Sequence, residues 1–158
     1  MPDDGKLMKI GLIVAVAIIL IRIILEQAGA PLAVNYIFGV AWLYFVMPVL
    51  FAISIRTFGR ARPFGRLLKD VVLFAVYTRV MVAITYMLAY YLRWDASRFS
   101  EKQGGTVGDS ITVLQGLLLI PLRNVFFWIV MATVLGIIIG SITLAVKRKP
   151  PQGTLNPA

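Results

Sequence analysis

Four long apolar runs constrain the fold of this chain more than any other feature. They cover residues 7–25, 32–55, 71–92 and 111–146. As α-helices rising about 1.5 Å per residue, the first three runs reach roughly 28 to 36 Å, close to the hydrocarbon thickness of about 30 Å of a bilayer. With 59% hydrophobic residues, the chain is also too apolar for an ordinary soluble domain. We therefore expect an all-α integral membrane protein, a four-helix bundle formed by one domain, residues 1–149.

The fourth run is longer than one membrane crossing requires. As a single helix it would extend roughly 54 Å, yet it is slightly short for two crossings joined by a turn. Pro121, Arg123 and Asn124 interrupt it. We therefore predict a short outer segment over residues 111–122, either re-entrant or lying on the interface, and a fourth span over residues 125–146.

Basic residues predict the orientation of the spans, because lysine and arginine near span ends favour the cytoplasmic side. Ten of the sixteen basic residues fall in three segments that alternating spans place on one side. These are Lys6 and Lys9, then Arg56, Arg60, Arg62, Arg66 and Lys69, and finally Lys147, Arg148 and Lys149. The pattern predicts a bacterial inner-membrane protein with both termini in the cytoplasm, including a proline-rich tail at residues 150–158. It also accounts for the basic charge without nucleic acid, for which the sequence contains no binding module.

The first run also imitates a secretory signal peptide. Lys6 and Lys9 precede its apolar stretch, and the small residues 28–30 follow it. Pro31 after the cleavage position and Arg22 inside the run argue against cleavage, so we expect the run to be retained as the first span.

The residues that carry most metal and redox chemistry are missing. The chain contains no cysteine and no histidine, which excludes disulfides, thiol chemistry and any zinc or haem site that depends on those ligands. No glycine-rich phosphate loop or Ser-His-Asp arrangement is recognisable. We expect a non-enzymatic protein that holds no cofactor through histidine or cysteine and binds phospholipid.

Small residues spaced four apart predict helix contacts, because membrane helices associate through close packing. The first run contains Gly11 and Ala15, and the fourth contains Ala132, Gly136 and Gly140. We expect these five residues at helix-packing positions, either inside the bundle or against another chain.

Arg22 and Glu26 continue the face that Gly11 and Ala15 mark on the first run. At about 100° per residue, positions four apart lie one above the other on a helix. We therefore predict an ion pair between Arg22 and Glu26 near the outer boundary of the membrane.

Arg79 lies deep in the third run without an acid at its level. It stands roughly 13 Å along the helix from Asp70, and an ionised arginine at such a depth is costly unless it is paired or hydrated. Three interpretations stay open. Its side chain extends to lipid phosphates on the cytoplasmic side, or it pairs with another subunit, lipid or cofactor, or it binds a transported anion.

The stretch "RTFGRARPFGR" between the second and third runs repeats the triplet Phe-Gly-Arg. Its aromatic residues can enter the membrane interface while its arginines meet anionic headgroups. We expect lipid contact there, with an acidic partner surface as the other option. The residues concerned are Arg56, Phe58, Arg60, Arg62, Phe64 and Arg66.

Taken together, these features predict an accessory subunit that stabilises a larger membrane complex and binds lipids. Arg79 without a partner and the small-residue face of the fourth run favour this role. Its partners would be membrane lipids and other membrane-protein subunits. The alternative is a small oligomeric channel or transporter for an anionic or amphiphilic solute.

Overall fold

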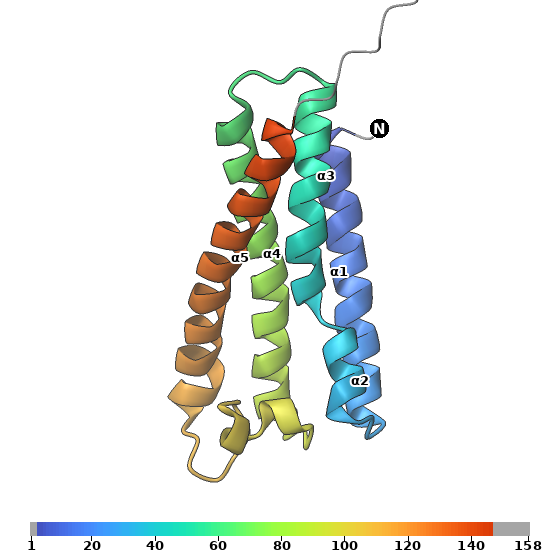
Figure 1. Ribbon diagram of the computed structural model, residues 1–158. Helices are drawn as coiled ribbons and strands as arrows, with labels where there is room; N and C mark the ends of the chain where they lie inside the picture. The colour runs from blue at the N-terminus through green and yellow to red at the C-terminus, as the bar shows by residue number, and fades with distance from the viewer. Residues whose placement is uncertain (1–2, 147–158) are drawn as a thin grey trace, which may run out of the picture.

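The computed structural model describes residues 3–146, and over that range the chain is helical and contains no β-strand (Figure 1). An isolated bridge joins Ser100 to Val107. The helices, in chain order, are α1 (Asp4–Gln27), α2 (Leu32–Ile37), η1 (Val40–Trp42), α3 (Leu43–Thr57), α4 (Pro63–Leu92), η2 (Ser97–Phe99), η3 (Glu101–Gln103), the π-helical turn η4 (Gln115–Leu119) and α5 (Ile120–Ala145). The basic residues 147–149 and the predicted tail 150–158 lie outside the described residues.

Four helical stretches are long and apolar enough to cross a membrane, which confirms the number of apolar helices expected from the sequence. They are Asp4–Gln27, Ala33–Thr57, Pro63–Leu92 and Gln115–Ala145. The start of α1, the α3–α4 connection and the end of α5 lie at the top of Figure 1, which we call the terminal end. The connections over residues 28–31 and 93–114 lie at the opposite end, which we call the loop end.

Local capping signals set the ends of the long helices. The side chain of Asp3 accepts a hydrogen bond of 2.8 Å from the backbone N–H of Lys6 and so caps the start of α1. Gly29 follows α1 with a φ of +76°, a conformation that glycine adopts without steric cost. Pro63 opens α4, where its fixed φ suits the first turn and its missing N–H costs nothing.

Helix α4 occupies the centre of the bundle and packs against α1, α3 and α5 (Figure 1). The largest fully buried side chains of α3 and α4 lie towards the terminal end, and they include Phe51, Ile55, Leu67 and Phe74. The rings of Phe51 and Phe74 meet edge to face, with their centroids 6.2 Å apart. The terminal half of the bundle is therefore a tightly packed apolar core.

Glycines allow α5 to approach the other helices closely. A Cβ atom placed on Gly136 would lie 2.6 Å from Cγ1 of Val71, and one placed on Gly140 would lie 2.7 Å from Cδ2 of Leu67. The other three predicted packing residues, Gly11, Ala15 and Ala132, are also buried. The small-residue faces of α1 and α5 thus pack against other helices of the same chain, and side chains of α3 and α4 lie directly against these small residues.

The second span, predicted over residues 32–55, is present as the stretch Ala33–Thr57, but its helix is interrupted. The helix stops after Ile37, the chain is extended at Gly39 with a φ of −101° and a ψ of 133°, and η1 and α3 follow. Glycine has a low helix propensity because it loses more backbone freedom than other residues when it becomes helical. A Cβ atom at this position would also lie only 3.2 Å from the carbonyl oxygen of Tyr36.

The prediction of a segment over residues 111–122 that is separate from the fourth span is wrong. Helix runs without a break from Gln115 to Ala145. Pro121 lies in the first turn of α5, directly after the π-helical turn η4. Proline lacks an N–H and crowds the carbonyl four residues earlier, and here it lies where the π-turn hands over to the α-helix. Gly116 also brings this end close to α4, since a Cβ there would lie 2.2 Å from the ring of Tyr90.

Candidate functional site

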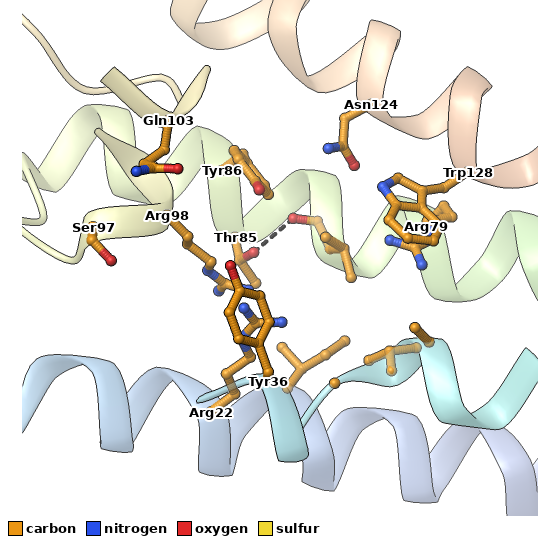
Figure 2. Close-up of a pocket in the computed structure, with 15 residues that line it drawn as sticks. Arg22, Tyr36, Arg79, Thr85, Tyr86, Ser97, Arg98, Gln103, Asn124 and Trp128 are labelled. Carbon is orange, nitrogen blue, oxygen red and sulfur yellow. Dashed lines mark hydrogen bonds between the residues drawn. The ribbon is translucent and has the colours of Figure 1, made fainter. Parts of the chain in front are cut away.

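A cavity of about 330 Å³ opens in the loop half of the bundle. Its floor is α4, and its walls are α5 on one side and α1, α2 and η1 on the other, with η2 and η3 at the loop end (Figure 2). A volume of this size lies at the lower end of the range for small-ligand pockets. The lining residues that carry polar groups are Arg22, Tyr36, Arg79, Thr85, Tyr86, Ser97, Arg98, Gln103, Asn124 and Trp128. We call this space the arginine pocket.

The interruption at Gly39 helps to form the arginine pocket. Gly39, Val40 and Ala41 line it, and α2 and η1 pack against α1 and α3. In the terminal half, by contrast, α3 packs directly against α5. Non-helical backbone is tolerated at membrane depth only where it is covered by protein or lines a cavity. The broken helix satisfies that condition because Gly39 and Val40 are buried against the pocket.

Arg79 is held between two aromatic rings. Its Cζ atom lies 4.8 Å from the ring centroid of Tyr44 on α3 and 4.4 Å from that of Trp128 on α5. Such cation–π contacts stabilise an arginine that has lost its water. The residue is only 6% exposed, and its buried Nε donates to no acceptor among the described residues. The structure thus gives Arg79 aromatic neighbours inside the chain and leaves its Nε without an acceptor among the described residues.

Tyr44 is fixed in place by its own hydrogen bond. Its hydroxyl group lies 2.8 Å from Oγ1 of Thr78, which in turn donates to the carbonyl oxygen of Phe74 at 2.8 Å. Tyr44 and Thr78 are both buried. This contact between α3 and α4 orients the ring against which the guanidinium of Arg79 lies.

Glu26 joins two other arginines at the loop end of the pocket. Nε of Arg22 donates to Oε1 of Glu26 at 2.9 Å, and Nε of Arg98 lies 3.0 Å from Oε2. Nε of Arg98 and Oε2 of Glu26 are close enough for an ion pair, but they are not aligned as a hydrogen bond. Nε and Nη2 of Arg98 therefore have no hydrogen-bond acceptor among the described residues. The side chain of Glu26 is 3% exposed. The predicted Arg22–Glu26 pair is therefore part of a larger cluster.

Aromatic rings also cover Arg98. Its guanidinium lies 4.3 Å from the ring centroid of Phe99 and 5.7 Å from that of Tyr86. Phe99 is fully buried and anchors the 93–110 connection on α4. Burial lowers the pKa of Arg98 to about 10, although the nearby Glu26 carboxylate opposes this change. Arg98 is still charged at neutral pH.

The arginine pocket therefore carries an excess of positive charge. Three guanidinium groups, from α1, α4 and η2, line it, and the Glu26 carboxylate contacts two of them, those of Arg22 and Arg98. Arg22 lies close enough to both Arg79 and Arg98 for its charge to act on each. In a setting that excludes water, such a group of cations is stable only when anions or aromatic rings face it. The arrangement is suited to binding an oxyanion.

The predicted basic stretch lies at the terminal end, far along the bundle from the pocket. Nε of Arg66 lies 3.1 Å from Oδ2 of Asp4, and Nε of Arg60 lies 3.7 Å from the same atom. Ser54 donates to Oδ1 of Asp4 at 2.7 Å. Arg56 donates to the carbonyl oxygen of Val146. Part of this basic charge is thus used inside the chain, to tie the start of α1 and the end of α5 to the α3–α4 connection.

The other residues of that stretch face outward. Phe58 and Phe64 are exposed, and the guanidinium of Arg60 lies 5.6 Å from the ring centroid of Phe58. Arg62 is exposed and adopts a left-handed conformation with a φ of 53°. These side chains remain candidates for contact with lipid headgroups or an acidic partner.

Three features of the pocket were missed from the sequence: Arg98, Trp128 and the helix break at Gly39. Arg98 follows Asp95 and precedes Glu101 in a connection of mixed charge, so nothing local distinguishes it from a solvated arginine. The isolated glycine within an apolar run was the one available signal for the break. No local signal pairs Trp128 with Arg79, which is 49 residues away in the sequence.

Comparisons with known proteins add no relative: no protein-family model, curated protein or solved structure matches this chain.

Proposed function

We propose that this chain is a non-enzymatic membrane protein whose arginine pocket binds the anionic headgroup of a membrane lipid. One observation carries the proposal. Arg79, at 6% exposure, has an unused Nε donor, and it borders a cavity that Arg22 and Arg98 also line. An unpaired buried cation is costly, whereas arginine binds phosphate and carboxylate oxygens strongly and with defined geometry.

The position of the pocket fits a lipid better than a soluble ion. Its walls belong to helices that are apolar enough to cross a membrane, and Tyr36 at its edge is 68% exposed. About 330 Å³ has room for a headgroup but not for acyl chains as well. The chains would remain in the bilayer, along apolar side chains of α5 such as Phe126 and Phe127, which are exposed.

The distribution of basic residues supports an orientation with both termini in the cytoplasm of a bacterial inner membrane. In that orientation the loop end faces the periplasm. The arginine pocket then lies in the outer half of the membrane, and its ligand would come from the outer leaflet. The basic connection that contains Phe58 and Phe64 would meet anionic headgroups of the inner leaflet.

The bound lipid suits a stabilising subunit of a larger membrane complex. One observation favours this role. Trp42 is 61% exposed and carries an indole N–H donor, and its ring centroid lies 6.2 Å from that of Phe45. It lies roughly 22 Å along the helix from Thr57, which is still within a hydrocarbon core of about 30 Å. A neighbouring chain that supplies an acceptor would relieve the cost of leaving this N–H in lipid.

A transporter for an anionic amphiphile is the second candidate. Its support is the interrupted helix at Gly39, because many transporters bind their substrates at breaks in membrane helices. Mass spectrometry of chains that co-purify in mild detergent separates the two roles. Larger partners in fixed stoichiometry support the subunit, whereas a homogeneous assembly of this chain alone supports the transporter.

Binding itself can be tested with the purified chain in mild detergent. Native mass spectrometry would compare anionic and zwitterionic phospholipids on the wild type, Arg79→Gln and Arg123→Gln. Arg123 is a matched control, because it is an exposed arginine at the same end of α5 but does not line the pocket. We expect the affinity of Arg79→Gln for anionic phospholipid to be about tenfold or more below that of the wild type. Arg123→Gln should bind with the affinity of the wild type. Equal binding by all three proteins would exclude the proposal.

A further inference from the structure

We infer that the arginine pocket selects a phosphomonoester, which carries two negative charges, over phosphodiesters and carboxylates, which carry one. This inference rests on the proposed function and specifies the ligand class of the same site. Phosphatidic acid is the simplest lipid with such a headgroup, and glycerol 3-phosphate is its soluble counterpart.

The charge balance of the pocket leads to this ligand class. Three guanidinium groups line the cavity, and the Glu26 carboxylate that contacts two of them neutralises one charge. Among the described residues that line the cavity there is no carboxylate, so an excess of two positive charges remains. A dianion balances this excess, whereas a phosphodiester leaves one positive charge uncompensated in a setting of low polarity.

The placement of the donors points the same way. In Figure 2, Arg79 lies beside Trp128 at one side of the cavity, while Arg22 and Arg98 lie together at another. Donors without an acceptor among the described residues are present on both sides, namely Nε of Arg79 and Nη2 of Arg98. A phosphomonoester has three terminal oxygens that accept hydrogen bonds strongly in different directions. A phosphodiester has two such oxygens and a second substituent that would need room in the cavity.

Glu26 sets the charge that the ligand must match. It is almost completely buried and holds Arg22 and Arg98 together by contacts of 2.9 and 3.0 Å. Without this carboxylate the excess would be three charges. Arg22 and Arg98, which Glu26 holds, therefore form one side of the site, and Arg79, which has aromatic rings but no carboxylate in contact with it, forms the other.

The test uses the full chain in mild detergent and measures dissociation constants for phosphatidic acid and phosphatidylglycerol. At pH 8 we expect phosphatidic acid to bind about tenfold more tightly. At pH 5 the advantage should fall to about twofold, because a phosphate monoester dianion takes up one proton near pH 6 and becomes a monoanion. The titratable groups around the site are Arg22 and Glu26 on α1, Tyr36 on α2, Tyr44 on α3, Arg79 and Tyr86 on α4, and Arg98 on η2, and the chain contains no histidine.

Arg79→Gln provides the decisive comparison. This substitution reduces the excess positive charge from two to one. It should therefore weaken the binding of phosphatidic acid by about tenfold or more and remove the preference for phosphatidic acid over phosphatidylglycerol. Arg79→Lys keeps the charge and should keep the preference, which separates charge matching from a loss of folding. Arg123→Gln should leave both constants unchanged.

The outcomes separate this inference from the proposed function. If Arg79→Gln weakens both lipids but phosphatidylglycerol binds the wild type as tightly as phosphatidic acid at pH 8, the selectivity is wrong and lipid binding stands. If Arg79→Gln affects neither lipid, both proposals are wrong. Competition by glycerol 3-phosphate would show that a soluble phosphomonoester is also a ligand. If glycerol 3-phosphate does not displace bound phosphatidic acid, the site is specific for the lipid.

Discussion

Arg79 of α4 and Trp128 of α5 form a cation–π pair, with the arginine Cζ atom 4.4 Å from the ring centroid. This contact joins two helices at the arginine pocket and takes the place of a carboxylate partner. Tyr44 covers the guanidinium from α3 at 4.8 Å. Three helices thus share in holding one buried charge, and several measurable consequences follow.

Replacing Trp128 by leucine should destabilise the bundle and weaken anion binding together. The ring contributes cation–π stabilisation of about 1 to 2 kcal/mol to a desolvated arginine. We expect a lower midpoint of thermal unfolding in detergent and a weaker affinity for anionic lipid. Trp128→Phe retains an aromatic face and should lose clearly less of both. If leucine and phenylalanine behave alike, the aromatic face is not what stabilises Arg79.

Replacing Glu26 by glutamine should destabilise the lipid-free protein, because it leaves the Arg22 and Arg98 charges without their carboxylate. Removal of one partner from a buried ion pair costs about 3 kcal/mol. Thermal unfolding with and without phosphatidic acid would measure this cost, and we expect the added lipid to restore much of the lost stability. Glu101→Gln is the control, since Glu101 is an exposed carboxylate of the 93–114 connection, which also contains Arg98. If the Glu26→Gln protein is as stable as the wild type, the contacts of Glu26 with Arg22 and Arg98 do not stabilise the bundle.

Replacing Gly136 by leucine should disturb the contact between α5 and the centre of the bundle. A Cβ atom there would lie 2.6 Å from Val71 and 3.1 Å from Pro48, so α5 must move outward. Overpacking of this kind costs about 1 to 3 kcal/mol, which thermal unfolding in detergent would measure. Gly65→Leu in the first turn of α4 is the matched control, because a Cβ atom there meets no other atom within 4 Å. An equal effect of the two substitutions would argue against close packing at Gly136.

The orientation in the membrane can be tested with single cysteines, since the natural chain has none. Ala61 lies in the α3–α4 connection and Asp109 in the 93–114 connection, and both are exposed. In intact cells we expect an impermeant thiol reagent to label Asp109→Cys from the periplasm. It should label Ala61→Cys only after the inner membrane is permeabilised. The reverse pattern would place the arginine pocket in the cytoplasmic leaflet.

Features that depend on one helix alone could be predicted from the sequence. The apolar runs predicted four long helices because a membrane crossing requires a definite number of apolar residues. Arg22 and Glu26 could be placed together because positions four apart share a helix face. Gly136 and Gly140 could be placed at a contact for the same reason. In each case the helical period supplies the geometry.

Local irregularities were harder to predict, because they reflect competition between backbone and packing. Gly39 interrupts a run that reads as one span, while Pro121 does not interrupt the run in which it lies. A π-turn before Pro121 and the contact of Gly116 with Tyr90 keep that helix continuous. Whether a glycine or a proline ends a helix thus depends on the packing contacts that neighbouring helices make at that position.

By itself, the sequence determined that this chain forms long apolar helices with small-residue contact faces and a local ion pair on α1. Only the tertiary structure decided that Arg79 lies between Tyr44 and Trp128, and that Arg98 joins Glu26 from a distant connection. The reason is that helical periodicity fixes which residues share a face, whereas the rotation and tilt of packed helices fix which faces meet. The arginine pocket exists because four chain segments meet around α4, and no single segment encodes it.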